Sequence, residues 1–146
     1  MSKVEFKQND TEKALFVNGA CQGVSDRFNR PLSPYMGFIA DHLKGLAKPE
    51  TEGLGISCLF LGGGAMILPT FARGLGMSLI VFENDPDVYE AAKEHFQGLS
   101  IGPVVYAVDA RSFNGYLSAQ LKYDFILIDV YEGAIRPTGI YEAEFV

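Results

Sequence analysis

The chain has 146 residues, of which 48% are hydrophobic and 21% charged, and its formal net charge is −6. This size and composition predict one soluble globular domain that can bury a core. The negative charge argues against nonspecific binding to nucleic acid and mildly favours a cationic ligand or partner. No apolar run approaches the ~20 residues that span a bilayer, and the N-terminal MSKVEFKQND has no apolar signal core, so we expect no membrane attachment. Because Cys21 and Cys58 are expected to be reduced, we expect a cytoplasmic protein.

The side chains that most often bind metals are sparse in this chain. The cysteines, Cys21 and Cys58, form no CxxC pair, and we expect each to be a buried, reduced thiol. His42 and His95 lie far apart on predicted helices and lack neighbours at metal-ligand spacing. No metal site is therefore expected.

The N-terminal part is expected to form short strands followed by a helix. Residues 4–7 and 14–18 read as strands, and the intervening NDTE supplies turn chemistry, which predicts a β-hairpin. A further short strand is expected over Cys21–Ser25. Ser33 and Pro34 then begin a helix as its N-cap and first residue. The apolar face of this helix is expected to contain Tyr35, Phe38, Ile39, Leu43 and Leu46, and Tyr35 is alternatively a pocket-wall residue.

The polar connector Lys48–Gly55 divides the chain into an N-terminal element, residues 1–48, and a core, residues 49–146. In the core, continuous apolar runs alternate with helical segments, which predicts an α/β fold with a parallel sheet covered on both faces. Right-handed crossovers give the strand order 3-2-1-4. The expected strands are Ile56–Leu61, Ser78–Phe82, Val104–Val108 and Phe125–Val130. The expected helices are Met66–Leu75, Pro86 to about Phe96, capped by Asp85, and Ser112–Leu121.

The fourth core strand would lie at an open edge of this sheet, and an uncovered apolar edge promotes association. We therefore expect either pairing at this edge, as in a homo-oligomer such as a dimer, or a longer protein of which this chain is a fragment.

Consecutive glycines, Gly62, Gly63 and Gly64, follow the first core strand. Glycines let the backbone approach a ligand closely, and the helix N-terminus behind them offers free N–H groups. Glu83 ends the second strand 19 positions after Gly64, a spacing typical of an acid that binds ribose hydroxyls. GxGxxG is absent because Ile67 stands in place of the third glycine, which disfavours a dinucleotide. The pattern predicts a nucleoside site; the alternative is a tight turn without a ligand.

Acidic residues also end the other core strands. Asp109 can accept a hydrogen bond from the adenine amine, or it can cap a helix or pair with Arg111. Asp129 is followed three residues later by Glu132. Two such carboxylates can hold a cationic group or take a proton from an attacking amine, and the alternative is that both are solvated loop acids.

Six stretches occur along the chain in this order: VNGACQGVSDRFNRPLSPYM, LFLGGGAMILP, VFENDPDVYEAAKEHF, VVYAVDARSF, YDFILIDVYEG and GIYEAEF. Together they resemble the spermidine synthase-like (polyamine aminopropyltransferase) branch of the class I S-adenosylmethionine-dependent methyltransferase fold. The resemblance covers roughly residues 14–145. The resemblance implies a Rossmann-like parallel sheet with a small N-terminal β-hairpin element.

The resemblance also implies roles for individual residues. S-adenosylmethionine or its decarboxylated form would be the co-substrate, and a polyamine would accept the aminopropyl group. Gln22 would lie over the thioether or sulfonium end of the bound molecule, and Asp109 would contact adenine. Asp129 and Glu132 would correspond to the family's D-x-x-D pair, whose second acid is the base for the amine. The donor-binding residues would be Gln22, Gly62, Gly63, Gly64, Glu83, Asp109 and Ala110.

The sequence departs from the family at three points. Ala65 stands where the family's GGGDG loop has an acid that meets the aminopropyl ammonium and repels the carboxylate of ordinary S-adenosylmethionine. Glu132 replaces an aspartate and is one methylene longer. The family continues with further strands that complete the sheet and much of the amine pocket. A small-molecule methyltransferase and a catalytically inactive, truncated domain are therefore the alternatives to an aminopropyltransferase.

Overall fold

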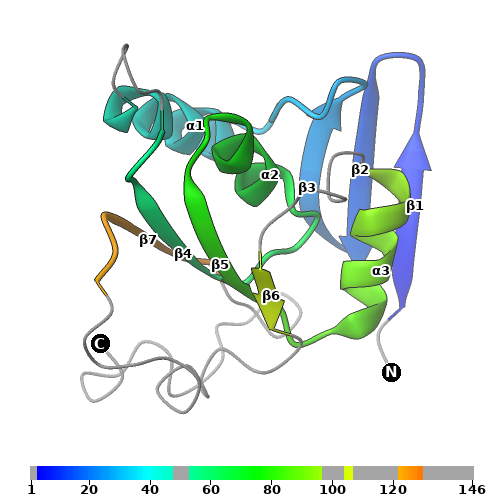
Figure 1. Ribbon diagram of the computed structural model, residues 1–146. Helices are drawn as coiled ribbons and strands as arrows, with labels where there is room; N and C mark the ends of the chain where they lie inside the picture. Colours follow the sequence, from blue (N-terminus) through cyan, green and yellow to red (C-terminus); the bar gives the residue numbers. More distant parts are fainter. Residues whose placement is uncertain (1–2, 48–52, 97–103, 107–121, 130–146) are drawn as a thin grey trace.

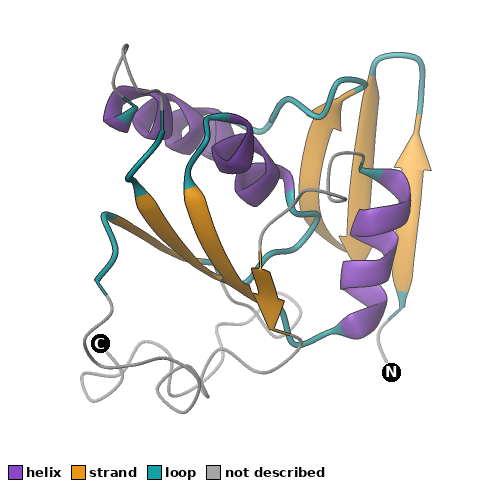
Figure 2. Cartoon of the chain, in the orientation of Figure 1, coloured by secondary structure: helices purple, strands orange, loops and turns teal. Residues whose placement is uncertain are grey.

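The computed structural model describes residues 3–47, 53–96, 104–106 and 122–129, which form two sheets and three helices (Figures 1 and 2). The N-terminal sheet is antiparallel and contains β1 (Val4–Gln8), β2 (Glu12–Val17) and β3 (Ala20–Asp26) in sequence order. Among the described residues, no helix has both the length and the apolar character needed to cross a membrane.

The N-terminal strands are joined by turns whose chemistry is local. The side chain of Asn9 accepts hydrogen bonds from the N–H groups of Thr11 and Glu12, both at 2.9 Å, and so forms the turn between β1 and β2. Asn18 and Gly19 connect β2 to β3 with φ values of 50° and 81°. Positive φ at both central residues is the signature of the two-residue turns that suit the twist of a hairpin.

The core sheet is parallel, and its strands lie in the order β6-β5-β4-β7, which is 3-2-1-4 when they are counted along the chain. These strands are β4 (Ser57–Leu61), β5 (Ser78–Phe82), β6 (Val104–Tyr106) and β7 (Phe125–Ile128). Leu61 is level with Phe82 on one side and with Ile128 on the other. The central strands therefore end together, and the residues that follow them meet at one edge.

The described residues contain three helices: α1 (Pro34–Leu46), α2 (Ile67–Gly74), which packs on β5, and α3 (Pro86–His95). Because α2 and α3 each connect neighbouring parallel strands in the same direction, right-handed crossovers place both on the same face. α1 packs beside α2, and α3 packs against β1 and β2 (Figure 1). The expected helix over Ser112–Leu121 lies outside the described residues.

The caps of α1 and α3 differ. Asp85 caps α3, because its Oδ1 accepts hydrogen bonds from the N–H groups of Asp87 at 3.0 Å and Val88 at 3.4 Å. This confirms the prediction for α3. Ser33 does occupy the N-cap position of α1, but its side chain makes no cap hydrogen bond. The fixed φ of Pro34, rather than the Ser33 hydroxyl, therefore defines the start of α1.

The prediction for the apolar face of α1 was wrong in part. Tyr35 and Phe38 are 50% and 76% exposed, whereas Met36, Ala40 and Leu43 are buried. The buried residues are spaced four and three apart and therefore form one stripe. The small side chain of Ala40 and the flexible one of Met36 allow α1 to lie close to its neighbours. The helical spacing of apolar and aromatic residues alone did not identify the side that faces the core.

The N-terminal sheet and the core sheet share one hydrophobic cluster, to which β2 contributes Leu15 and Val17. β3 lies close to the start of α2 at Gly23, where a Cβ atom would lie 2.8 Å from Cδ1 of Ile67 and 3.1 Å from Cβ of Ala65. A glycine at this position lets β3 pack directly on the start of α2. The predicted boundary between residues 1–48 and 49–146 stays a prediction.

The buried side chain of Lys13 on β2 links the N-terminal sheet to the C-terminal end of α3. Nζ of Lys13 donates hydrogen bonds to Oδ1 of Asn29 at 2.5 Å and to the backbone oxygen of His95 at 3.1 Å. Burial lowers the pKa of Lys13. The ring of Phe6 stacks on His95 with a centroid separation of 3.9 Å. A cation that binds the last carbonyls of a helix stabilises its C-terminus, so Lys13 fixes where α3 ends.

The cysteines differ in exposure. Cys58 on β4 is fully buried, as predicted, and burial raises its pKa to about 11. Cys21 on β3 is exposed, so the prediction of a buried thiol was wrong at this position.

We expect one thiol of the native protein to react with iodoacetamide at pH 8, because only exposed thiols are accessible and only thiolates are nucleophilic. Peptide mass mapping should find the label on Cys21, and rapid labelling of Cys58 would contradict the burial.

Candidate active site

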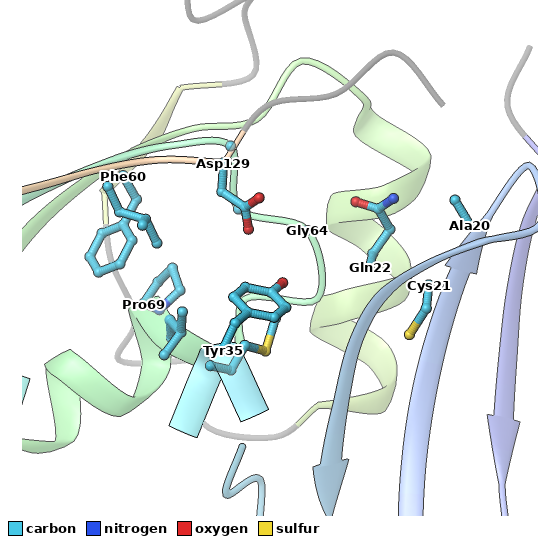
Figure 3. Close-up of a pocket in the computed structure, with 13 residues that line it drawn as sticks. Ala20, Cys21, Gln22, Tyr35, Phe60, Gly64, Pro69 and Asp129 are labelled. Carbon is cyan, nitrogen blue, oxygen red and sulfur yellow. The ribbon is translucent and has the colours of Figure 1, made fainter. Parts of the chain in front are cut away.

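A cavity of about 370 Å³ lies at the carboxyl ends of β4 and β7, and β3, the first turn of α1 and the start of α2 complete its wall (Figure 3). Ligands of open α/β sheets bind at this edge. The predicted site residues in the wall are Gln22, Gly62, Gly63, Gly64 and Asp129. The cavity therefore joins residues from both sheets that lie far apart in the sequence.

Gln22 reaches the cavity because of an irregularity in β3. Phe16 on β2 pairs with Cys21 and Leu15 pairs with Gly23, so Gln22 is an extra residue, as in a β-bulge. Bulges redirect side chains and are frequent next to active sites. A Cβ atom on Gly64 would lie 3.1 Å from the backbone oxygen of Gln22. The bulge and the glycine loop are therefore in direct contact.

The conformation and packing of the glycine loop, Gly62 to Gly64, require glycine residues. Gly62 and Gly64 have φ values of 94° and 51°, and Met66, the N-cap of α2, has a φ of 60°. Side chains rarely tolerate such values. A Cβ atom on Gly63 would lie 2.2 Å from Cε of Met66. Both the backbone conformation and the packing thus favour glycine throughout the loop.

Glu83 lies beside this loop but outside the cavity wall. Its Oε1 accepts hydrogen bonds from the N–H groups of Gly63 at 3.2 Å and Gly64 at 3.0 Å, and its Oε2 accepts one from the N–H of Asp85 at 3.1 Å. The residue is 9% exposed. Burial raises the pKa of Glu83, and the three backbone hydrogen bonds partly offset this shift because they favour the ionised form.

Asp129 and Tyr35 face one another across the cavity. Asp129 directly follows β7, and Tyr35 projects from the first turn of α1, so that its hydroxyl lies beside the carboxylate (Figure 3). Burial raises the pKa of Asp129, and a hydrogen bond from Tyr35 partly offsets the shift. Asp129 is the one charged side chain among the described residues that line the cavity. The site can therefore hold a cation or accept a proton.

The fold of this chain is similar to those of several solved structures, although no family model and no curated protein matches the chain. Among solved structures, a probable spermidine synthase from Corynebacterium glutamicum matches 99% of this chain, with a TM-score of 0.80 and 20% identity. A spermidine synthase in complex with the transition state analogue AdoDATO matches 98%, with a TM-score of 0.56 and 17% identity. A putative RNA methyltransferase from Pyrococcus horikoshii matches 80%, with a TM-score of 0.51 and 21% identity.

The chain has the spermidine synthase fold, which is of the class I methyltransferase type. The match covers 54% and 50% of the two spermidine synthase structures and 56% of the methyltransferase structure, so the chain spans about half the length of these structures.

Within the spermidine synthase fold, the site holds some of the predicted residues and leaves others untested. Asp109, Ala110 and Glu132 lie outside the described residues. Ala65 is 1% exposed and packs under Gly23 instead of lining the cavity. No group of side chains that could hold a metal ion occurs within the part of the chain that the structure describes.

Sequence reasoning missed other features of the wall. Leu68 and Pro69 at the start of α2 and Cys21 on β3 also line the cavity. The sequence did contain a signal for Pro69, because a proline in the first turn of a helix marks the end of the helix that follows the glycine loop. The β-bulge at Gln22 had no signal in the sequence, since it depends on the register of β3 against β2.

Proposed function

We propose that this chain forms the donor-binding part of a spermidine synthase-like transferase, which binds S-adenosylmethionine or its decarboxylated form and transfers an aminopropyl group to a polyamine. The cavity that brings Gln22, the glycine loop and Asp129 together carries this proposal. The fold supports it, and so does the ligand of one matching structure, in which a spermidine synthase is bound to a transition state analogue.

The cavity suits a cationic donor. Among the described wall residues there is a carboxylate, Asp129, and no lysine or arginine. The decarboxylated donor carries a sulfonium and an ammonium group but no carboxylate, so its charge complements the wall. Gln22 would lie beside the sulfonium end, and the glycine loop, Glu83, Asp109 and Ala110 would hold the nucleoside.

The reaction that we propose is an in-line displacement. The lone pair of the acceptor amine attacks the carbon next to the sulfonium, the carbon–sulfur bond breaks, and its electron pair stays on sulfur to give methylthioadenosine. Asp129, together with Glu132, would position the cationic amine, and one of these carboxylates would take the proton that the amine loses. Catalysis would come from positioning and from deprotonation.

The pair of Tyr35 and Asp129 makes a pH dependence testable. Replacement of Tyr35 by phenylalanine removes a hydrogen bond that favours the ionised carboxylate, so the pKa of Asp129 should rise. The acidic limb of the rate profile should then move to higher pH, while the rate at high pH falls less than about tenfold. Steady-state rates between pH 5 and 9 measure this. Tyr89→Phe on α3, outside the cavity wall, should leave the limb in place.

Two assays test the proposed function. Calorimetric titration compares S-adenosylmethionine, its decarboxylated form and methylthioadenosine. A transfer assay with putrescine and the decarboxylated donor measures methylthioadenosine release. We expect binding of the decarboxylated donor and release of the product. If the full chain binds the donor but releases no methylthioadenosine with any polyamine, aminopropyl transfer is excluded.

Ala65 favours one alternative, a small-molecule methyltransferase. It provides an apolar, 1% exposed side chain where the related aminopropyltransferases have an acid that repels ordinary S-adenosylmethionine. Tight binding of the carboxylated donor, with none of the decarboxylated one, would support this alternative. An inactive domain would bind none of the three nucleosides. The homodimer stays a prediction, and light scattering coupled to size-exclusion chromatography tests it.

A further inference from the structure

The N–H groups of Gly63 and Gly64 both point at one oxygen atom, Oε1 of Glu83. Successive backbone N–H groups that converge in this way form an anion-binding nest, the feature with which glycine loops bind phosphates. In this protein the nest already contains an anion, which belongs to the chain itself. The carboxylate has little contact with solvent, because Glu83 is 9% exposed.

The sheet register explains why Glu83 fills the nest. Leu61 and Phe82 are level in the parallel pair of β4 and β5, and the N–H of Gly62 donates to the backbone oxygen of Phe82 at 2.8 Å. The next residue, Glu83, therefore lies directly beside the loop. The N–H of Asp85 holds Oε2 at 3.1 Å and so fixes the other end of the carboxylate.

We propose that Glu83 is a specificity-determining residue, whose carboxylate fills the anion nest of the glycine loop and so restricts the site to nucleosides without a phosphate group. The inference rests on the proposed nucleoside site and adds a selection rule to it. A phosphate at the loop would meet a fixed negative charge and no free N–H donor at Gly63 or Gly64. An uncharged or cationic 5′ substituent, such as a sulfonium, would meet no such penalty.

Two variants separate the effect of the Glu83 charge from the effect of its side-chain length. Glu83→Gln keeps the length of the side chain and removes its charge. Glu83→Asp keeps the charge and is one methylene too short to bridge the loop and Asp85. The matched control is Glu90→Gln, which removes an exposed carboxylate from the outer side of α3. The probes are adenosine, adenosine 5′-monophosphate and inorganic phosphate, each titrated by calorimetry.

The ratio of the two nucleoside affinities is the decisive readout. We expect the wild-type protein and Glu90→Gln to bind adenosine at least tenfold more tightly than its monophosphate. In Glu83→Gln this preference should shrink at least tenfold, whereas Glu83→Asp should keep it with weaker binding of both. If Glu83→Gln weakens both ligands equally and leaves the ratio unchanged, Glu83 acts only on the ribose and the inference is overturned.

A second measurement does not depend on nucleoside binding. In the wild-type protein, inorganic phosphate should leave the amide NMR signals of Gly63 and Gly64 unchanged, and in Glu83→Gln it should shift them. If no nucleoside binds but this contrast is observed, the proposed function fails and the filled nest stands. Equal responses of the two proteins to phosphate would overturn the exclusion of phosphate by the Glu83 carboxylate, because Glu83→Gln keeps the acceptor oxygen and removes only the charge. If Glu83→Gln does not fold, acidification of the wild-type protein removes the same charge, and the same contrast is expected between low and neutral pH.

Discussion

Replacement of Asp129 by asparagine is expected to lower the rate of aminopropyl transfer at least about a hundredfold, the usual range for loss of a positioned acid–base group. Asp129 is the charged group of the described cavity wall, and its carboxylate would hold the cationic amine and, with Glu132, accept its proton. Asparagine has nearly the same shape but neither a charge nor a basic oxygen. Donor affinity should change much less than the rate. Single-turnover kinetics with saturating donor separate the two effects.

The same variant should be at least as stable as the wild-type protein at neutral pH. Burial raises the pKa of Asp129, so the folded state binds its proton more tightly than the unfolded state does. The corresponding stability is fully present below the unfolded pKa of about 3.9 and is lost as pH rises through the raised folded value. Asparagine resembles the protonated form and avoids this loss. Urea unfolding at pH 7 should therefore favour the variant, and at pH below ~4 the difference should disappear.

Asp41→Asn is the matched control, since Asp41 is exposed on α1 and lies outside the cavity wall. This control should leave the rate unchanged. If Asp129→Asn keeps the rate of the wild-type protein, the role of Asp129 in the reaction is contradicted, and if it is clearly less stable at pH 7, the predicted effect of burial on its carboxylate is contradicted.

The parts of the fold that the sequence predicted well depend on local chemistry. The strand Ser78–Phe82 has the predicted bounds, and Asp85 caps the helix that follows it. A short apolar run between glycine and an acid, and an Asp-Pro pair before a helix, each define structure within a few residues. The glycine loop also lies where it was predicted. Its neighbours in the chain determine its position at the end of β4.

The parts that the sequence did not predict depend on contacts between distant segments. Phe38 is exposed because the buried stripe of α1 runs through Met36, Ala40 and Leu43, and both faces of α1 contain apolar residues. Gln22 enters the cavity because β3 has one residue more than β2 at that point. The contact of Glu83 with the loop requires both the register of β4 against β5 and the length of a glutamate side chain. Pairings between strands, not local propensity, decide each of these features.

Replacement of Gly23 by alanine is expected to lower the free energy of unfolding by about 1–3 kcal/mol, the usual cost of an extra methyl group in a packed core. The new Cβ atom would lie 2.8 Å from Cδ1 of Ile67, 3.1 Å from Cβ of Ala65 and 3.4 Å from Cε of Met36. The ends of the isoleucine and methionine side chains can move, but Ala65 has no rotamer by which to yield. The overlap with Ala65 can therefore be removed only if β3 and α2 move apart. Urea unfolding measures the resulting loss of stability.

This separation would also affect the site, because Gln22 precedes Gly23 and the glycine loop precedes Ala65. Donor affinity should fall together with stability in Gly23→Ala. Gly37→Ala on α1 is the matched control, since a Cβ atom there meets nothing within 4 Å. That substitution should stabilise the protein by about 0.5–1 kcal/mol, because alanine favours a helix over glycine. The same change of residue thus has opposite signs at two positions. If both variants were stabilised, the close contact between β3 and α2 would be contradicted, and with it the wall that the N-terminal sheet contributes to the cavity.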